Sequence, residues 1–343
     1  MNNVKSTAWI EDGEKYAVMG LEVKYEGGSP PGKISPNIWV LADTAFKVPE
    51  HWQESLGSIR TKQIEACNLF LLSKLSSLTR DVLDGENQKL QERVQNCYVG
   101  LLLASPFAPA HKPVLLTGSR REEEIVVRQQ SDFETPIPDL IRPYPPVGLE
   151  DVLLAAHLGE MLEAFLNARV RGGHWRFFQT LNIYIQTRTT QNILDRLHQY
   201  CRCIDGLILP DAGETRRQFK SRTELFIGPR HHELMGEIYD VRSAVEHLHE
   251  NRYLEPFDRT IRLDLLQKEA IVGYIARTAL ARILNDDNLW SHFANASLLS
   301  EFWKLPSARR KEIWGESIDP MVAVSQFNPS YIHDGMLGGL NSG

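Results

Sequence analysis

Apolar residues recur through much of this chain at alternating steps of three and four residues, which is typical of amphipathic helices. The pattern starts near His51, continues to residue 78 and resumes over 87–105. From residue 149 onward it covers most of the chain, and the longest segments are 149–166, 174–209 and 262–284. The chain is therefore predicted to be mainly α-helical.

Two regions have a different pattern and predict strands. The segment YAVMGLEVKYEGG (16–28) is rich in β-formers and predicts one or two strands. PVLLTGSR and EIVVRQQ predict the two strands of a hairpin around a charged turn at 120–124. With the helices between them, these segments predict an α+β module over residues 1–140, such as a sensor or a partner-binding domain.

A proline-rich segment separates this module from the C-terminal part of the chain. PIPDLIRPYPPVG (136–148) has five prolines in thirteen residues, and proline fixes φ and removes an amide donor. We expect an extended connector at 141–150 and a helical domain at 150–315. Residues 316–343, which end in GGLNSG, are predicted to form a flexible tail.

Composition narrows the class of protein. A net charge of −6 argues against a general nucleic-acid coat, so any contact with RNA has to be local. The sequence has no apolar run near the roughly 18 residues of a membrane span and no signal peptide at its N-terminus. Its cysteines give no disulfide framework and no zinc-ligand spacing: Cys67, Cys97, Cys201 and Cys203. We expect a cytoplasmic protein without a bound metal or cofactor.

Common catalytic motifs are missing from the sequence. There is no G-x-x-x-x-G-K-[ST] loop, no G-x-G-x-x-G after a strand, no H-E-x-x-H and no G-x-S-x-G. P-loop hydrolysis, dinucleotide redox chemistry, zinc proteolysis and serine-hydrolase chemistry therefore lack support.

One predicted helix, at about 231–250, carries candidate chemistry. Its apolar stripe is Leu234, Ile238, Val241, Val245 and Leu248. At about 100° per residue, Arg242 lies roughly 80° from the centre of this stripe and His247 lies nearly opposite it. The polar half also holds Tyr239, Asp240, Ser243 and Glu246. Histidine suits proton transfer at physiological pH, and the planar fork of arginine suits phosphate.

This helix resembles the Arg-x4-6-His motif of the HEPN superfamily, whose helical domains occur in ribonuclease toxins and phage-defence proteins. The preceding segment, CIDGLILPDAGETRRQFKSRTELFIG, is similar to the Apea-like branch of that superfamily. The similarity covers roughly residues 150–285. It implies a helical bundle that acts as a metal-independent endoribonuclease in phage defence or a toxin system. It also implies a homodimer with a composite Arg/His site, and it is compatible with a regulatory protein or antitoxin as partner.

The resemblance and the residue chemistry together assign candidate roles. Arg242 would stabilise the phosphorane and His247 would act as general acid or base. Three neighbours on the helix could support them: Tyr239, Ser243 and Glu246. Local contact with the RNA backbone is expected from five basic residues, which are Arg216, Arg217, Lys220, Arg222 and Arg230.

Several alternatives stay open. Arg242 and Glu246 could form only an exposed helical salt bridge, and the basic residues at 216–230 could be a solvated helix face. Ser243 stands where many active HEPN members carry Asn, Asp or His, which favours a non-catalytic module that binds RNA, a nucleotide or a protein. The motif could also be coincidental in a helical interaction protein. Five C-terminal aromatic residues are expected to serve core packing or an interface rather than base stacking: Trp290, Phe293, Phe302, Trp303 and Trp314.

Overall fold

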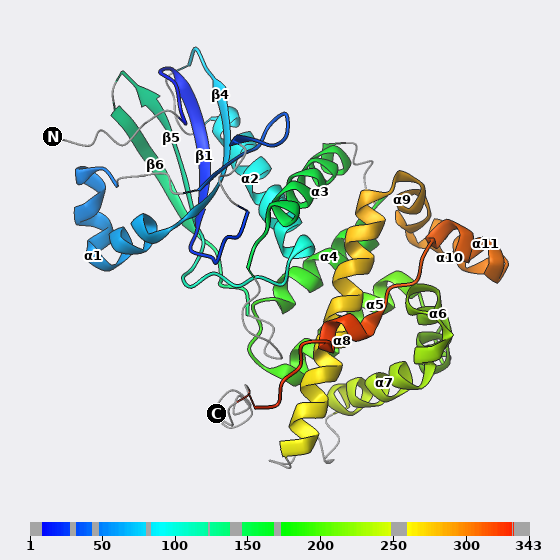
Figure 1. The fold of residues 1–343 in the computed structure, drawn as a ribbon. Helices are drawn as coiled ribbons and strands as arrows, with labels where there is room; N and C mark the ends of the chain where they lie inside the picture. The colour runs from blue at the N-terminus through cyan, green and yellow to red at the C-terminus, as the bar shows by residue number, and fades with distance from the viewer. Residues whose placement is uncertain are drawn as a thin grey trace. The chain divides into compact units, whose positions relative to one another are not determined.

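Two compact units make up the chain (Figure 1). The first comprises Met1–Pro136 and Tyr144–Asn167, and the second comprises Ile137–Pro143 and Ala168–Gly343. The computed structural model describes residues 9–27, 32–42, 48–79, 84–122, 124–137, 146–167, 173–247, 259–330 and 332. The prediction of a mainly α-helical protein with an N-terminal α+β part is confirmed.

The first unit is built on a six-stranded antiparallel sheet in the order β2-β3-β4-β1-β5-β6. Its central strand, β1, is buried along its whole length. Because successive side chains of a strand point to opposite faces, Tyr16 and Val18 lie on one face while Lys15 lies on the other. The strands are β1 (Glu14–Leu21), β2 (Gly32–Lys33), β3 (Trp39–Ala42), β4 (Leu69–Ser76), β5 (Val114–Arg121) and β6 (Glu124–Asp132).

Helices cover both faces of this sheet. On the Tyr16 face, Ile64 of α1 (Glu50–Ala66) joins a core cluster with Tyr16 and Phe70. On the opposite face, α2 (Gly85–Ala104) packs against β1 and β4. The predicted 113–130 hairpin is confirmed as β5 and β6.

The segment 69–76 was expected to continue the helix that starts near His51, and this prediction is wrong. It forms β4, which pairs with both β1 and β3. A short, continuous apolar run fits a buried strand as well as a buried helix, and periodicity cannot separate the two. Strand pairing on both sides therefore decides the outcome.

Helix α3 (Leu149–Asn167) belongs to the first unit, so the domain boundary expected at 141–150 is misplaced. It packs closely on α2 through two glycines. A Cβ on Gly100 would lie 2.2 Å from the carbonyl oxygen of Ala155, and one on Gly159 would lie 2.8 Å from the Cα of Cys97. A proline-rich sequence does not determine which core receives the helix that follows it. Residues 141–145 of the predicted connector lie outside the described residues.

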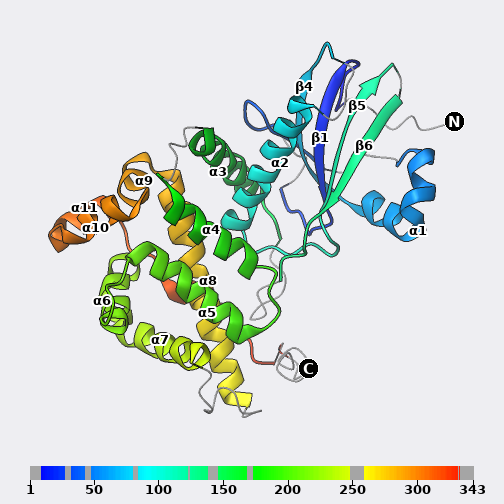
Figure 2. The same cartoon turned by 180° about the vertical axis from the view of Figure 1, so that it is seen from behind.

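The second unit is helical, and α5 occupies its centre (Figure 2). Helix α5 packs against α4, α7 and α8, and more lightly against α6 and α10. The helices are α4 (Trp175–Thr187), α5 (Ile193–Ile208), α6 (Thr215–Ile227), α7 (His232–Glu246), α8 (Arg259–Asn285), α9 (Asp287–Phe293), α10 (Ala296–Lys304) and α11 (Ser307–Trp314).

The single long helix expected at 174–209 is wrong, because the segment forms α4 and α5 with a turn between them. Asn192 starts the second helix: its side-chain oxygen accepts hydrogen bonds from the N–H groups of Leu194 and Asp195. This side chain satisfies amide donors that the start of a helix leaves unpaired. The turn sets the direction of α5 independently of α4.

Aromatic side chains form much of the core near the C-terminus, as expected. All five predicted residues are buried. The rings of Phe226 and Trp314 lie 4.5 Å apart between centroids, and those of Phe293 and Phe302 lie 5.2 Å apart. These aromatic side chains therefore pack in the core and are not available to stack on bases.

The tail expected to be flexible from residue 316 is ordered over its described part. The 3-10 helix η2 (Pro320–Val324) packs against α8, and Ile332 is buried in a cluster with Leu266. Arg259 donates hydrogen bonds to the carbonyl oxygens of Pro329, at 3.0 Å, and Ile332, at 2.8 Å. Residues 331 and 333–343 of the predicted tail lie outside the described part of the chain.

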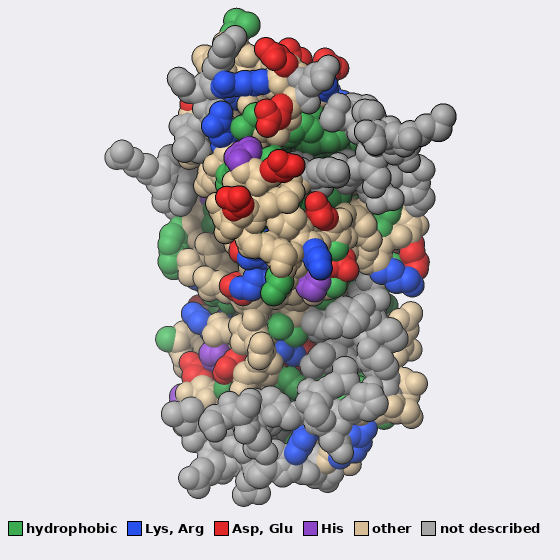
Figure 3. All heavy atoms as spheres, turned by 90° about the vertical axis from the view of Figure 1, so that its left-hand side faces the viewer, with side chains coloured by type: hydrophobic (Ala, Val, Ile, Leu, Met, Phe, Trp, Pro, Cys, Tyr) green, Lys and Arg blue, Asp and Glu red, His purple; other side chains and the backbone are tan. Residues whose placement is uncertain are grey.

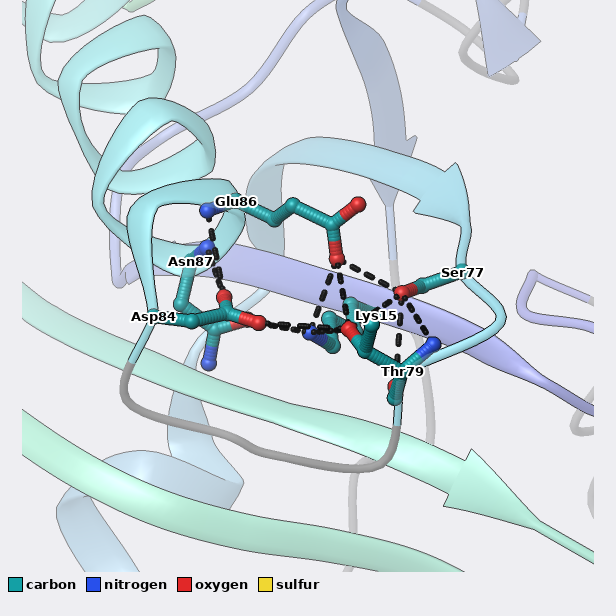
Figure 4. Close-up of polar contacts among 6 residues, drawn as sticks. All are labelled: Lys15, Ser77, Thr79, Asp84, Glu86 and Asn87. Atoms are coloured by element: carbon teal, nitrogen blue, oxygen red, sulfur yellow. Dashed lines mark hydrogen bonds and ion pairs between the residues drawn. The ribbon is translucent and has the colours of Figure 1, made fainter.

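A buried lysine ties the start of α2 to the sheet (Figure 4). Lys15 is 1% exposed, and its Nζ contacts Asp84, the Glu86 Oε2 at 2.8 Å and the Thr79 Oγ1 at 2.9 Å. Asp84 also caps α2 by accepting from the N–H groups of Glu86 and Asn87. The hydrogen bonds from Lys15 lower the pKa of both the Asp84 and the Glu86 carboxyl.

On the face drawn in Figure 3, Lys and Arg side chains are interspersed with Asp and Glu side chains. This agrees with the net charge of −6 and with the expectation that any contact with a polyanion is local. Within the described residues, every helix is too short or too polar to cross a membrane.

The variant Lys15→Met tests the role of the buried network. It leaves two carboxylates facing each other without their cation, and we expect the free energy of unfolding to fall by about 2 kcal/mol. This is less than the loss for a fully buried pair, because Asp84 and Glu86 are partly exposed.

Urea denaturation measures the change, with Lys24→Met as the matched control. Lys24 pairs with Glu26, and both side chains are largely exposed. The control should alter stability by less than about 0.5 kcal/mol. Equal effects of the two substitutions would contradict the role given to Lys15.

Candidate functional site

Helix α7, which carries the Arg-x4-His element, starts and ends close to the predicted residues. Helix α6 ends at Ile227, and Gly228 comes next with a φ of 81°, so the stop predicted at Gly228-Pro229 is confirmed. The 3-10 helix η1 (Pro229–His231) leads into α7, which ends at Glu246. His247 is the C-cap, and its N–H donates to the carbonyl oxygen of Ser243 at 3.1 Å.

The buried face of α7 differs from the predicted stripe. Tyr239, expected on the polar half, is 7% exposed, whereas Leu234 is only half-buried. The Tyr239 hydroxyl donates to the Thr215 Oγ1 at 2.8 Å, and its ring lies 5.4 Å from that of Phe219. Because α7 packs against both α5 and α6, its buried arc is wider than one stripe: Met235, Ile238, Tyr239, Val241 and Ala244.

The Arg242 guanidinium is held on three sides. Its Nη1 lies 2.6 Å from the Glu246 Oε2, and its Nη2 lies 3.5 Å from the Asp205 Oδ2. Its Cζ lies 5.3 Å from the centroid of the Tyr239 ring, within the range of a cation–π contact. Tyr239 and Glu246 thus both contact Arg242, as expected of supporting residues. The side chain of Arg242 is 15% exposed, so it is not the exposed salt-bridge arginine of the alternative interpretation.

Sequence reasoning missed the contribution of α5. Asp205 lies near the C-terminal end of this helix, and His198 lies seven residues earlier, which places both on one face at helical spacing. Their spacing of seven residues, which places two titratable side chains on one face, is the signal that could have identified them. Neither residue is close to Arg242 in the sequence, so only the packing of α5 against α7 joins them.

Burial controls the protonation of this cluster. It raises the pKa of the Asp205 carboxyl to about 6, and nearby Glu246 raises it further, whereas Arg242 opposes the shift. Burial also lowers the pKa of His198, and the positive charge of Arg242 lowers it further. At neutral pH, Asp205 is therefore mostly ionised and His198 is neutral.

Three polar atoms of the cluster are buried without a hydrogen-bond partner among the described residues. They are the Asp205 Oδ1, the His198 Nε2 and the Arg242 Nε. Nearly all buried polar atoms in proteins are paired, so three such atoms around one guanidinium are unusual. The cluster therefore retains hydrogen-bonding capacity.

His247 differs from Arg242 in its surroundings. Its side chain is exposed at the end of α7, and Ser243, one turn earlier, is half-buried. One helix thus presents a restrained guanidinium and, five residues later, an imidazole accessible to solvent. This combination can bind an anion and transfer a proton.

Every member of the predicted RNA-binding cluster pairs with an acidic side chain. Arg216 forms a bidentate pair with Asp240, at 2.7 and 2.8 Å. The other pairs are Arg217–Glu214, Lys220–Glu233, Arg222–Asp211 and Arg230–Asp319. Arg222 also donates to the carbonyl oxygens of Ile208 and Leu209 at the end of α5, a structural role. A phosphate would have to compete with carboxylates at each of these positions.

A surface hollow lies beside this cluster. It has a volume of about 430 Å³ and is lined in part by Glu214, Arg216, Arg217, Lys220 and His232. His232 in turn contacts Glu224 through its Nδ1 at 2.5 Å. The lining therefore combines both signs of charge.

Metal ligands are not grouped in the described residues. No set of three or more His, Cys, Asp and Glu side chains there is placed to hold a metal ion. Cys201 and Cys203 are buried on α5, and burial raises the pKa of both thiols. These cysteines are therefore protonated core side chains.

Comparisons with protein-family models, with curated proteins and with solved structures found no match. The assignment of this site therefore rests on the residues and their geometry.

The Asp205 carboxyl should titrate with a midpoint of about 6. The variant Arg242→Met should raise that midpoint, because it removes the positive charge that favours the carboxylate. Carbon-detected NMR of the Asp205 carboxyl measures both values. Arg309→Met, which removes an exposed arginine of α11, should leave the midpoint unchanged. An Asp205 midpoint near 4 would contradict the burial argument.

The raised pKa of Asp205 also predicts a pH-dependent stability. The ordinary pKa of an Asp carboxyl is 3.8, and that of Asp205 in the folded protein is about 6. Between these two pH values, the folded protein binds more protons at this carboxyl than the unfolded chain does. Stability contributed by Asp205 is therefore present below pH 4 and is lost as pH rises to about 6. Over this pH range the native protein should lose free energy of unfolding on the order of 2 kcal/mol through Asp205, and Asp205→Asn should not show this loss.

Urea denaturation at pH 4 and pH 6.5 measures the free energy of unfolding of the native protein and of the variant, and the change between the two pH values is compared. Asp195→Asn, at an exposed position on the same helix, is the control and should behave like the native protein. A variant Asp205→Asn with the native pH dependence would exclude Asp205 as the titrating group.

Proposed function

We propose that the helical unit of this protein cleaves RNA without a metal ion, through Arg242 and His247. One observation carries the proposal: α7 ends with a guanidinium restrained by Tyr239, Asp205 and Glu246, followed by an exposed imidazole. A cation that is held in position can stabilise a developing negative charge, and an accessible histidine can exchange protons with a substrate. The resemblance of this helix to the HEPN motif agrees with the assignment.

The reaction needs two proton transfers and one charge stabiliser. A base removes the proton of the ribose 2′-hydroxyl, whose oxygen attacks phosphorus and displaces the 5′-oxygen. An acid then protonates that leaving oxygen, and the products are a 2′,3′-cyclic phosphate and a 5′-hydroxyl. His247 acts in proton transfer, and Arg242 binds the phosphorane oxygens.

A homodimer completes this chemistry. One chain supplies one exposed imidazole in the motif, whereas the reaction uses both a base and an acid. Two copies of α7 facing each other would bring together two copies each of Arg242 and His247. The mass of the protein in solution, measured by light scattering, is then expected to be twice the 39.1 kDa of the chain.

The biological setting we propose is phage defence or a toxin system that acts on cytoplasmic RNA. The α+β unit, or a separate regulatory or antitoxin protein, would restrain cleavage until a trigger arrives. Arg216, Arg217, Lys220 and Arg230 would contact the RNA backbone by exchanging their carboxylate partners for phosphates.

A second candidate is a non-catalytic module of the same kind that binds RNA, a nucleotide or a protein. The pairing of Arg242 with two carboxylates favours it, because an arginine already neutralised is a poorer stabiliser of a transition state. Ser243, in the place of Asn, Asp or His, favours it too. Binding without cleavage would select this candidate.

Purified protein in EDTA should cleave single-stranded RNA and leave DNA of the same sequence intact, because DNA lacks the attacking 2′-hydroxyl. Arg242→Ala and His247→Ala should each lower the cleavage rate by roughly 100-fold or more. Gel electrophoresis with mass analysis of the ends measures the rate and identifies the cyclic phosphate.

Two variants serve as controls for this experiment. Arg309→Ala and His157→Ala replace exposed residues of the same types at positions outside the site, and they should cleave at the native rate. Full cleavage by His247→Ala, or loss of cleavage in EDTA that Mg²⁺ restores, would overturn the metal-independent Arg/His assignment.

A further inference from the structure

The ion pair between Arg242 and Glu246 occupies one of the two terminal nitrogens of the guanidinium. Glu246 takes Nη1 at 2.6 Å, whereas Asp205 faces Nη2 at a longer 3.5 Å. A phosphate that binds arginine in the usual bidentate way needs two neighbouring N–H groups. The carboxylate of Glu246 therefore stands where a phosphate oxygen would bind.

The two carboxylates around Arg242 are not equivalent. Asp205 is 19% exposed and belongs to α5, the central helix of this unit. Glu246 is 41% exposed and is the last residue of α7. A negative charge at the C-terminal end of a helix is disfavoured by the helix dipole, so the more exposed Glu246 is the carboxylate that an anion displaces more easily.

Repulsion between negative groups favours the departure of one of the two carboxylates when an anion arrives. The charged groups facing this cluster from α4, α5 and α7 are Arg176, Asp195, Arg202, Asp205, Arg242 and Glu246, together with His198. A phosphate beside Arg242 would add a third negative group to one guanidinium. Glu246 can turn into solvent by breaking a single ion pair of a half-exposed side chain, whereas Asp205 is more buried and lies on the central helix α5.

We propose that Glu246 occupies the phosphate-binding edge of Arg242 in the free protein, and that a phosphodiester displaces it while Asp205 keeps the guanidinium in place. Glu246 thereby sets the affinity of the site, because only an anion that pairs with Arg242 better than this carboxylate can replace it. The inference rests on the proposed function only for the identity of the physiological anion. Occupation of Arg242 by phosphate is a separate, measurable property.

Inorganic phosphate is the probe for this experiment. It is titrated at constant ionic strength while the Nε–Hε NMR signal of Arg242, assigned by its loss in Arg242→Lys, reports binding. Glu246→Gln should bind phosphate roughly threefold more tightly than the native protein. Glu246→Asp should also bind more tightly, because its shorter side chain keeps the charge but holds it less closely against Nη1 than Glu246 does at 2.6 Å.

Glu237→Gln separates displacement from net charge. Glu237 lies on the same helix, is largely exposed and pairs with Lys268 at 3.1 Å, away from Arg242. This control removes the same charge and should leave the phosphate affinity within about 1.5-fold of the native value. An equal gain in Glu237→Gln and Glu246→Gln, or an unchanged affinity in both Glu246 variants, would overturn the proposal.

RNA cleavage is measured in the same three variants, so that the two proposals can fail separately. If native protein does not cleave RNA but Glu246→Gln and Glu246→Asp bind phosphate more tightly, displacement holds and the ribonuclease assignment fails. If native protein cleaves RNA but neither Glu246 variant gains phosphate affinity, the ribonuclease assignment holds and displacement fails.

Discussion

The packing of α5 against α7 decides the electrostatics of the candidate site. It places Asp205 beside Arg242 in a partly dehydrated position, where a carboxyl is costly to ionise and an arginine cannot be neutralised by deprotonation. Without α5, Arg242 would be an exposed helical arginine paired only with Glu246, four residues later. With α5, it is a restrained cation between carboxylates of unequal exposure.

Lys15 of the first unit and Arg242 of the second each face two carboxylates, and the contrast between them is informative. In the first unit, Lys15 is almost completely buried and contacts Asp84, Glu86 and Thr79, so its donors are used within the fold (Figure 4). In the second unit, the Arg242 Nε and the Asp205 Oδ1 are buried without partners among the described residues. Satisfied buried networks stabilise one structure, whereas unsatisfied polar atoms are a property of sites that hold strain or bind ligands.

The basic residues before α7 are less available to an anion in the folded protein than their sequence suggests. In the sequence they form a local positive run, but folding brings an acidic partner to each, and Asp319 comes from far along the chain to pair with Arg230. Exposed pairs of this kind contribute little to stability and exchange partners readily. Contact with an anion therefore depends on competition with carboxylates, both here and at Arg242.

The sequence by itself determined the features that depend on local periodicity. It indicated the predominance of helices, the β5–β6 hairpin, the end of α6 at Gly228-Pro229 and the placement of Arg242 near the end of a helix that His247 closes. These result from side-chain spacing and from backbone restrictions at glycine and proline, which act over a few residues.

Only the tertiary structure decided the rest. The strand β4 depends on pairing with β1 and β3, and α3 joins the first unit because Gly100 and Gly159 allow it to approach α2 closely. The burial of Tyr239 and the approach of Asp205 and His198 to Arg242 depend on contacts between helices. Sequence spacing gives the face of a helix on which a residue lies, but the partner of that face is set by packing among distant segments.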